Sequence, residues 1–148
     1  QIIKWSHEFR RIDPDYPTMK KRYFSGGAGL SSTAFDYAVF MQMLLNGGRY
    51  NGHQVLSKRT VEMMISGQLA PGLFGDDNMG LGFGITSERS AARGPRNAGS
   101  FAWGGYYGTT FWADPKARLV CLFMTQQNPN SHGDVEGKFE SILYSSLK

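Results

Sequence analysis

The sequence lacks the features that mark several common protein classes. It has one cysteine, Cys121, in 148 residues, so the chain can form no internal disulfide. Its histidines, His7, His53 and His132, have no metal-ligand spacing to one another or to that cysteine, which argues against a zinc site. No apolar run is long enough to span a membrane, and no signal peptide is visible. We therefore expect no metal or other cofactor and no membrane span, and the compartment is left open.

The charge balance is only mildly basic. Sixteen Lys and Arg against 12 Asp and Glu give a net charge of +4, with the excess concentrated before residue 23. A solvated, partly irregular surface explains this excess better than a nucleic-acid site, because no recognisable nucleic-acid-binding motif accompanies it. A hydrophobic content of 41% and an aromatic content of 14% instead predict a single globular domain over residues 1–148.

The first half of the chain reads as an irregular lead-in over 1–22 followed by a helical part over 23–66. Thr33 as N-cap, with Asp36 three residues later, predicts a helix over 34–46 that Gly47 stops. The Asn51-Gly52 pair then predicts a small hairpin over 49–55.

A second helix should begin at the cap residue Ser57 and run to about Ser66. Leu56 and Val61 occupy the two positions of a hydrophobic staple around this cap. The apolar residues 63–65 of the helix are expected to be buried.

The second half, residues 80–148, reads as a sheet closed by a helix. Residues 67–79, 89–99 and 114–118 read as loops or turns, and strands are expected over 81–86, 100–104, 107–113 and 119–126. Apolar residues on both faces mark the last strand as central, and the apolar stripe of 134–148 predicts an amphipathic helix on the sheet. The fold class is therefore α+β, with an antiparallel sheet of three or four strands packed by the C-terminal helix.

Most motif-like stretches have a simple structural explanation. Residues 76–78 lack the rest of a calcium loop, and the glycine-rich residues 25–29 lack the lysine and the preceding strand of a P-loop. There is no G-x-S-x-G elbow, and S-x-x-K occurs only from Ser145 to Lys148 at the C-terminus. One feature is harder to explain by structure alone: the paired glycines Gly104 and Gly105 weaken a strand unless something must approach its backbone closely.

Several stretches, taken in order, resemble the C-terminal part of the beta-lactamase-related serine hydrolases. This group holds class C beta-lactamases, DD-peptidase-like (penicillin-binding protein-like) proteins and carboxylesterases of the same fold. The stretches that carry the resemblance are Tyr23 to Thr33 before a helix, Asp36-Tyr37, Leu44 to Gly48, Gly80 to Gly84 and Trp103 to Pro115. Together they span the chain from Tyr23 to its end.

The resemblance implies an active-site role for four residues. In the family a Lys-Thr-Gly-type triad lies on the strand that lines the active site, and Trp103, Gly104 and Gly105 match it position by position. The backbone N–H of Tyr106 would be one of two oxyanion-hole donors, and the other would belong to the nucleophile. Trp103 replaces the lysine that receives a substrate carboxylate, which favours a small-molecule ester or amide substrate without that anion.

The resemblance also implies that the catalytic machinery is incomplete in this chain. The family's S-x-x-K nucleophile and its Tyr-x-Asn precede the matched part, and the chain begins at Gln1. We therefore expect the C-terminal portion of a hydrolase, inactive alone, from a family that is often periplasmic or secreted. The alternatives are a non-catalytic module that binds an acyl or peptide ligand, and a basic nucleic-acid-binding domain.

The same expectation has a consequence for the last strand. In the family, strands that precede the matched part pair beside it, so 119–126 would present an open apolar edge in this chain. Such an edge favours pairing with another copy of the chain or with residues 1–23.

Overall fold

The computed structural model describes residues 18–20, 22–23, 25–27, 29–127 and 133–147. The chain divides into two compact units, Gln1–Thr33 and Ala34–Lys148. In the first, the N–H of Gly29 donates to the carbonyl of Ser25 across 2.8 Å, and Gly26 and Gly27 lie in a turn. The prediction for residues 1–22 falls almost entirely outside the described residues.

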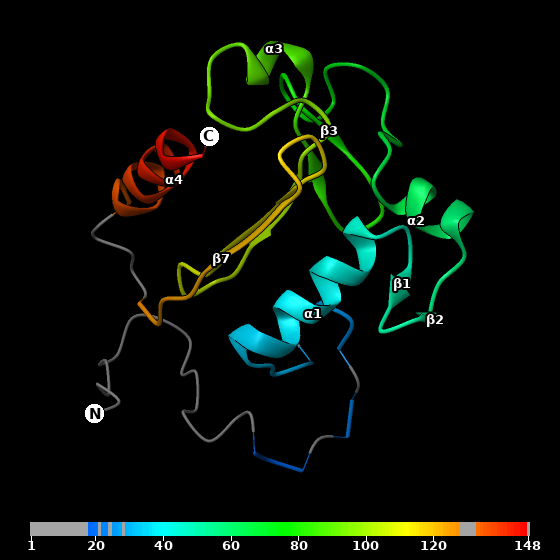
Figure 1. The fold of residues 1–148 in the computed structure, drawn as a ribbon. Coiled ribbons are helices and arrows are strands. Elements are labelled where there is room, and N and C mark those ends of the chain that lie inside the picture. Colours follow the sequence, from blue (N-terminus) through cyan, green and yellow to red (C-terminus); the bar gives the residue numbers. More distant parts are fainter. Residues whose placement is uncertain (1–17, 21, 24, 28, 128–132, 148) are drawn as a thin grey trace. The chain divides into compact units, whose positions relative to one another are not determined.

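The second unit combines helices with two antiparallel sheets, which confirms the α+β class (Figure 1). Its elements are α1 (Ala34–Leu45), β1 (Arg49–Tyr50), β2 (His53–Gln54), α2 (Lys58–Met64), β3 (Asn78–Met79), β4 (Gly84–Ile85), α3 (Glu88–Ala91), β5 (Phe101–Gly104), β6 (Thr110–Asp114), β7 (Leu119–Phe123) and α4 (Val135–Ser146). Strands β1 and β2 form a hairpin, and the larger sheet has the order β3-β4-β5-β6-β7.

The larger sheet has five strands, so the prediction of three or four was wrong. The missed strand is β3, which lies at the end of the predicted loop 67–79 and is too short to show an alternating pattern. Helix α3 was also missed where it overlaps the start of the predicted loop 89–99, and Ser87 caps it by accepting from the N–H of Ser90 at 3.1 Å. Neither element is long enough to show a local periodicity.

Several local signals were read correctly. Asn51 and Gly52 have φ values of 47° and 81°, as a type I′ hairpin turn requires. Ser57 caps α2, with its side-chain oxygen 3.0 Å from the N–H of Thr60. The burial predicted for residues 63–65 was wrong for Met63, which is 44% exposed, because α2 is short and buries Val61 instead.

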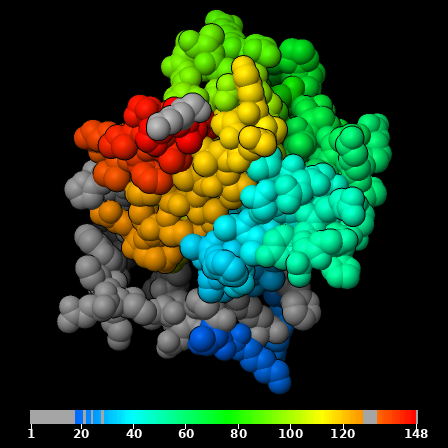
Figure 2. Space-filling model, viewed as in Figure 1, coloured from blue at the N-terminus to red at the C-terminus, as the bar shows by residue number. Residues whose placement is uncertain are grey.

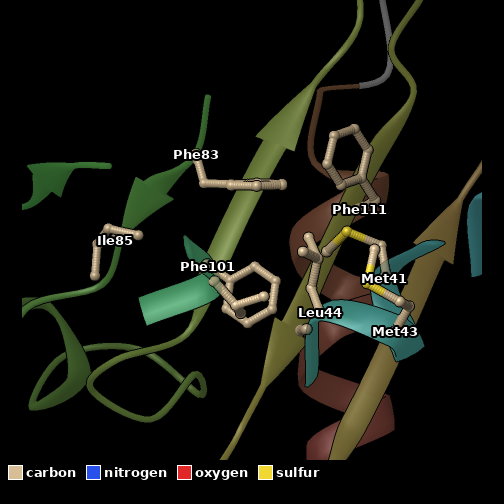
Figure 3. Close-up of a cluster of buried hydrophobic side chains, with 9 residues drawn as sticks. Met41, Met43, Leu44, Phe83, Ile85, Phe101 and Phe111 are labelled. Atoms are coloured by element: carbon tan, nitrogen blue, oxygen red, sulfur yellow. The ribbon is translucent and has the colours of Figure 1, made fainter. Parts of the chain in front are cut away.

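The core lies between α1 and one face of the larger sheet. Met41 and Leu44 of α1 face Phe83, which directly precedes β4, and the strand residues Phe101 and Phe111 (Figure 3). The ring of Phe83 makes edge contacts with the rings of Phe101 and Phe111, at centroid distances of 5.4 and 6.5 Å. Burial of these rings fixes the strands against α1.

Helix α4 covers the opposite face of the sheet, as predicted (Figure 1). Neighbouring residues of a strand point to opposite faces, so Phe111 turns to α1 and Trp112 turns to α4. The ring of Phe139 lies 6.3 Å from that of Trp112 and 5.1 Å from that of Phe123. The sheet is therefore sandwiched between two helices.

Strand β7 ends the sheet within the described residues, so the prediction that it is central was wrong for this chain. It is apolar on both faces because Val120 and Leu122 pack on the α1 side while Phe123 meets α4. Figure 2 shows β7 as an orange band between α1 (cyan) and α4 (red) on the face in view. Self-association along its outer edge stays a prediction.

The second glycine after α1, Gly48, occupies a position where a side chain would not fit. Its φ is +88°, and a Cβ at this position would overlap the carbonyl oxygen of Leu56. Gly52 has a similar φ of +81° but nothing within 4 Å of its Cβ position. Substitutions at Gly48 and Gly52 can therefore be compared to separate the cost of a left-handed φ from the cost of steric overlap.

Gly48→Ala should destabilise the chain more than Gly52→Ala, measured by urea unfolding. Strain at a left-handed φ should cost either variant about 1 kcal/mol. The overlap with Leu56 should add about 1 to 3 kcal/mol for Gly48→Ala alone. Equal losses in the two variants would contradict the close contact between Gly48 and Leu56.

Candidate functional site

The predicted site lies where β5 extends past its shorter neighbour. Strand β6 pairs with all of β5, but β4 pairs with only its first half, through Ile85 opposite Phe101 and Gly84 opposite Ala102. Within the described residues, Trp103 and Gly104 therefore have a strand beside them on the β6 side only. These two exposed residues, which have no β4 partner, form the open edge of β5.

The chain turns directly after Gly104. The N–H of Gly105 donates to the carbonyl of Thr109 at 2.7 Å, and the N–H of Gly108 donates to the carbonyl of Gly105 at 3.1 Å. Tyr106 therefore lies at the centre of a turn rather than on the strand, and the predicted strand 107–113 begins only at Thr110. The Tyr106 side chain is 62% exposed.

The tip of this hairpin is anchored to the segment that follows β7. The carbonyl of Tyr107 accepts from the N–H of Gln127 at 3.0 Å and from the hydroxyl of Thr125 at 2.8 Å. The Thr109 hydroxyl in turn donates to the carbonyl of Thr125 at 3.1 Å. These bonds hold the turn, and with it the Tyr106 backbone, in a defined position.

The glycine pair has a structural reason within the hairpin itself. A Cβ at Gly104 would lie 3.3 Å from the carbonyl oxygen of Thr109, and a Cβ at Gly105 would lie 3.3 Å from Thr109 Cβ. The close approach expected at these glycines is thus made by the chain's own Thr109. That they also leave room for a substrate stays a prediction.

Trp103 has an aromatic partner that sequence reasoning missed. The rings of Phe74 and Trp103 are stacked, with centroids 6.3 Å apart and an interplanar angle of 19°. Both side chains remain partly exposed, at 39% and 42%. The partner lies in a loop whose sequence shows no pattern, so only the tertiary structure reveals it.

A buried carboxylate organises the opposite end of β6. Asp114 is fully buried and accepts hydrogen bonds from the backbone and side-chain nitrogens of Asn97 (3.2 and 2.8 Å), the N–H of Ala117 (2.9 Å) and the hydroxyl of Tyr144 (2.8 Å). Burial raises the pKa of Asp114, but these hydrogen bonds outweigh it and hold the pKa below its usual value. Burial, and then its bond to Asp114, raise the pKa of Tyr144. Asp114 therefore ties a loop, a turn and α4 together.

A second polar contact fixes α4 to the sheet. Arg96 makes a two-point ion pair with Glu140, at 2.7 and 3.0 Å, and lies 3.5 Å from Glu136. Its guanidinium also stacks over the ring of Trp112, 4.5 Å from the centroid. These contacts are structural, because they join α4 to Trp112 of the sheet and do not involve the open edge of β5.

The other residues considered as possible sites either make local structural contacts or lie outside the described residues. Asp76 pairs with Arg89 at 3.2 Å and with Arg93, and the hydroxyl of Ser145 donates to the carbonyl of Ile142 at 2.8 Å. No group of three or more potential metal ligands occurs in the described part of the chain. Among the same residues, no helix is both long and apolar enough to cross a membrane. His7, His132 and Lys148 lie outside the described residues.

Comparison with known proteins identifies the family. The model of the beta-lactamase family matches residues 4–142. The chain belongs to the beta-lactamase family. This confirms the resemblance that the motifs predicted and places the chain among proteins of a hydrolase fold.

Individual relatives agree with this assignment. An uncharacterized protein of Mycobacterium tuberculosis is 35% identical over 122 residues, which cover 73% of this chain and 30% of that protein. A putative D-alanyl-D-alanine carboxypeptidase of Escherichia coli O157:H7 is 32% identical over 122 residues, covering 72% of this chain and 26% of its own length.

Solved structures share the fold. A putative 6-aminohexanoate-dimer hydrolase from Bacillus anthracis is 30% identical, with a TM-score of 0.59 over 78% of this chain and 28% of its own. EstCE1, a hydrolase with promiscuous acyltransferase activity, shows likeness in fold alone, with a TM-score of 0.76 at 23% identity over 91% of this chain and 35% of its own. The chain thus spans about a quarter to a third of the length of the proteins that it matches.

Proposed function

We propose that this chain forms one wall of the active site of a serine hydrolase of the esterase or amidase type. The observation that carries the proposal is the open backbone edge of Trp103 and Gly104, where β5 runs past the end of β4. The family's active-site triad matches these residues and Gly105. An extended substrate laid along this edge can form backbone hydrogen bonds with it.

The chemistry proposed for this wall is stabilisation of an oxyanion. The backbone N–H of Tyr106 would donate to the oxygen that becomes negative as an acyl group is attacked, and the N–H of the nucleophile would donate to the same oxygen. The hydrogen bonds that anchor Tyr107 and Thr109 to Thr125 support this role, because a donor must be held in place before the charge develops.

The substrate proposed is a small neutral ester or amide. Trp103 stands where the family's beta-lactamases and peptidases carry a lysine, so this wall offers no cation to a substrate carboxylate at that position. Two relatives at 30% identity or more carry hydrolase names, a putative carboxypeptidase and a putative 6-aminohexanoate-dimer hydrolase. These names support hydrolysis as the class of reaction, and the substrate has to be identified by experiment.

The nucleophile proposed for the complete site is a serine activated by lysine and tyrosine, which would form and then hydrolyse an acyl-enzyme. The S-x-x-K and Tyr-x-Asn motifs that supply these groups in the family do not occur at a suitable place in this chain. We therefore propose that the chain alone has no turnover.

Reaction with a fluorophosphonate probe tests this proposal. We expect no covalent adduct on the isolated chain by mass spectrometry, because no serine in it is activated. A chimera in which the chain replaces the matching stretch of the Escherichia coli relative should be labelled and should hydrolyse 4-nitrophenyl acetate.

The same chimera with the relative's S-x-x-K serine changed to alanine is the control and should lose both reactions. An adduct on the isolated chain would overturn the claim that its nucleophile is absent. A folded chimera that stays inert while the parent enzyme reacts would overturn the proposed role of this chain.

A further inference from the structure

The loop over residues 69–78 is closed by one side chain. The Oδ1 atom of Asn78 accepts from the N–H of Leu69 at 3.1 Å, and its Nδ2 donates to the carbonyl of Leu69, also at 3.1 Å. Gly67 makes room for this clamp, since a Cβ there would lie 2.6 Å from Asn78 Cγ. The N–H of Gln68 adds a bond to the carbonyl of Met79 at 2.8 Å. The base of the loop is therefore fixed to β3.

The far side of the loop is fixed as well. The carboxylate of Asp77 accepts from the N–H of Ser87 at 2.9 Å, and Asp76 pairs with Arg89 and Arg93 beside α3. An isolated bridge joins Phe74 to Asp77. A loop held at both ends can present one side chain in a defined position.

The side chain that it presents is Phe74. A Cβ on Gly84 would lie 3.4 Å from Phe74 Cε1, so the glycine lets the ring approach β4 at the residue where its pairing with β5 stops. There the Phe74 ring stacks on Trp103, whose own backbone forms the open edge of β5. The aromatic pair and the open edge are thus adjacent.

We propose that Phe74 and Trp103 together bind the apolar part of a neutral ester or amide, with aromatic or longer alkyl groups favoured over acetyl. This inference rests on the proposed function and adds a specificity-determining residue, Phe74, from outside the family's triad. Partly exposed aromatic faces bind apolar groups well, and the neighbouring backbone of Gly104 can hold the polar end of the ligand. Neither aromatic side chain carries a cation that could pair with an anionic ligand, so a neutral ester should bind more tightly than the anion.

The test titrates the ¹⁵N-labelled chain with methyl phenylacetate, methyl acetate and the phenylacetate anion. We expect methyl phenylacetate to shift the Trp103 indole signal, assigned with Trp103→Phe, and the Gly104 amide signal in a saturable way. Methyl acetate and the anion should bind more weakly. Phe74→Ala should weaken binding of methyl phenylacetate about three- to tenfold, the value of an aromatic pair.

Leu73→Ala is the matched control, since Leu73 precedes Phe74 in the same loop, is 71% exposed and should leave binding unchanged. Phe74→Tyr keeps the ring and should keep binding, which separates ring contact from misfolding. Equal binding of ester and anion, or equal loss in Leu73→Ala and Phe74→Ala, would overturn the inference. Because binding needs no nucleophile, failure here is distinguishable from failure of the labelling experiment on the chimera.

Discussion

Asp114→Ala is expected to destabilise the chain by about 3 kcal/mol or more, since each buried neutral donor left without its acceptor costs about 1 to 3 kcal/mol. The carboxylate is fully buried, and its loss would strand the donors of Asn97, Ala117 and Tyr144. Each stranded donor retains its desolvation cost without a partner. Helix α4 would also lose its Tyr144 contact with the 114–118 turn.

Urea unfolding at neutral pH measures this loss. Tyr144→Phe removes one of the bonds to Asp114 and should cost about 1 kcal/mol. Asp36→Asn is the control, because Asp36 is exposed in the first turn of α1 and should cost less than about 1 kcal/mol. If Asp114→Ala costs no more than the control, the buried network does not hold α4.

The pH dependence of stability follows from the same network. The folded-state pKa of Asp114 is lowered, so the folded chain binds the proton less readily than the unfolded chain. Its contribution is present above the unfolded pKa of about 3.9 and is lost as the pH falls through the lower folded-state value. Asp114→Asn should therefore flatten the acid limb of the stability curve relative to wild type.

Phe101→Ala should also destabilise the chain by about 3 to 5 kcal/mol, the range for removing a buried phenylalanine. Phe101 is 0% exposed, begins β5 and makes an edge contact with Phe83 at 5.4 Å. The cavity would open under the strand that carries Trp103 and Gly104. A loss of order at the candidate site should accompany the loss of stability.

Equilibrium unfolding, followed by tryptophan fluorescence, measures the effect. Phe35→Ala is the matched control, since Phe35 lies on α1 with 76% of its surface exposed and should change stability by less than about 0.5 kcal/mol. A small effect of Phe101→Ala, close to that of the control, would show that β5 is not anchored through this ring.

Local sequence signals determined the elements that they could encode. The Asn51-Gly52 turn and the Ser57 cap were predicted because each depends on a few adjacent residues. The motifs from Tyr23 onward predicted the family, which the family model confirms, and they singled out Trp103 and the glycines after it as the candidate site. The short elements β3 and α3 were not predictable, because neither is long enough to show a periodic pattern.

The sequence by itself thus determined the fold class, the family and the strand proposed to line the site. Only the tertiary structure decided which distant residues meet there: Phe74 stacks on Trp103, and Tyr144 donates to Asp114 across 30 positions of the chain. It also decided that β4 stops short of Trp103 and that Tyr106 lies in a turn. The physical reason is that such contacts depend on strand register, loop closure and burial, and no run of adjacent residues encodes them.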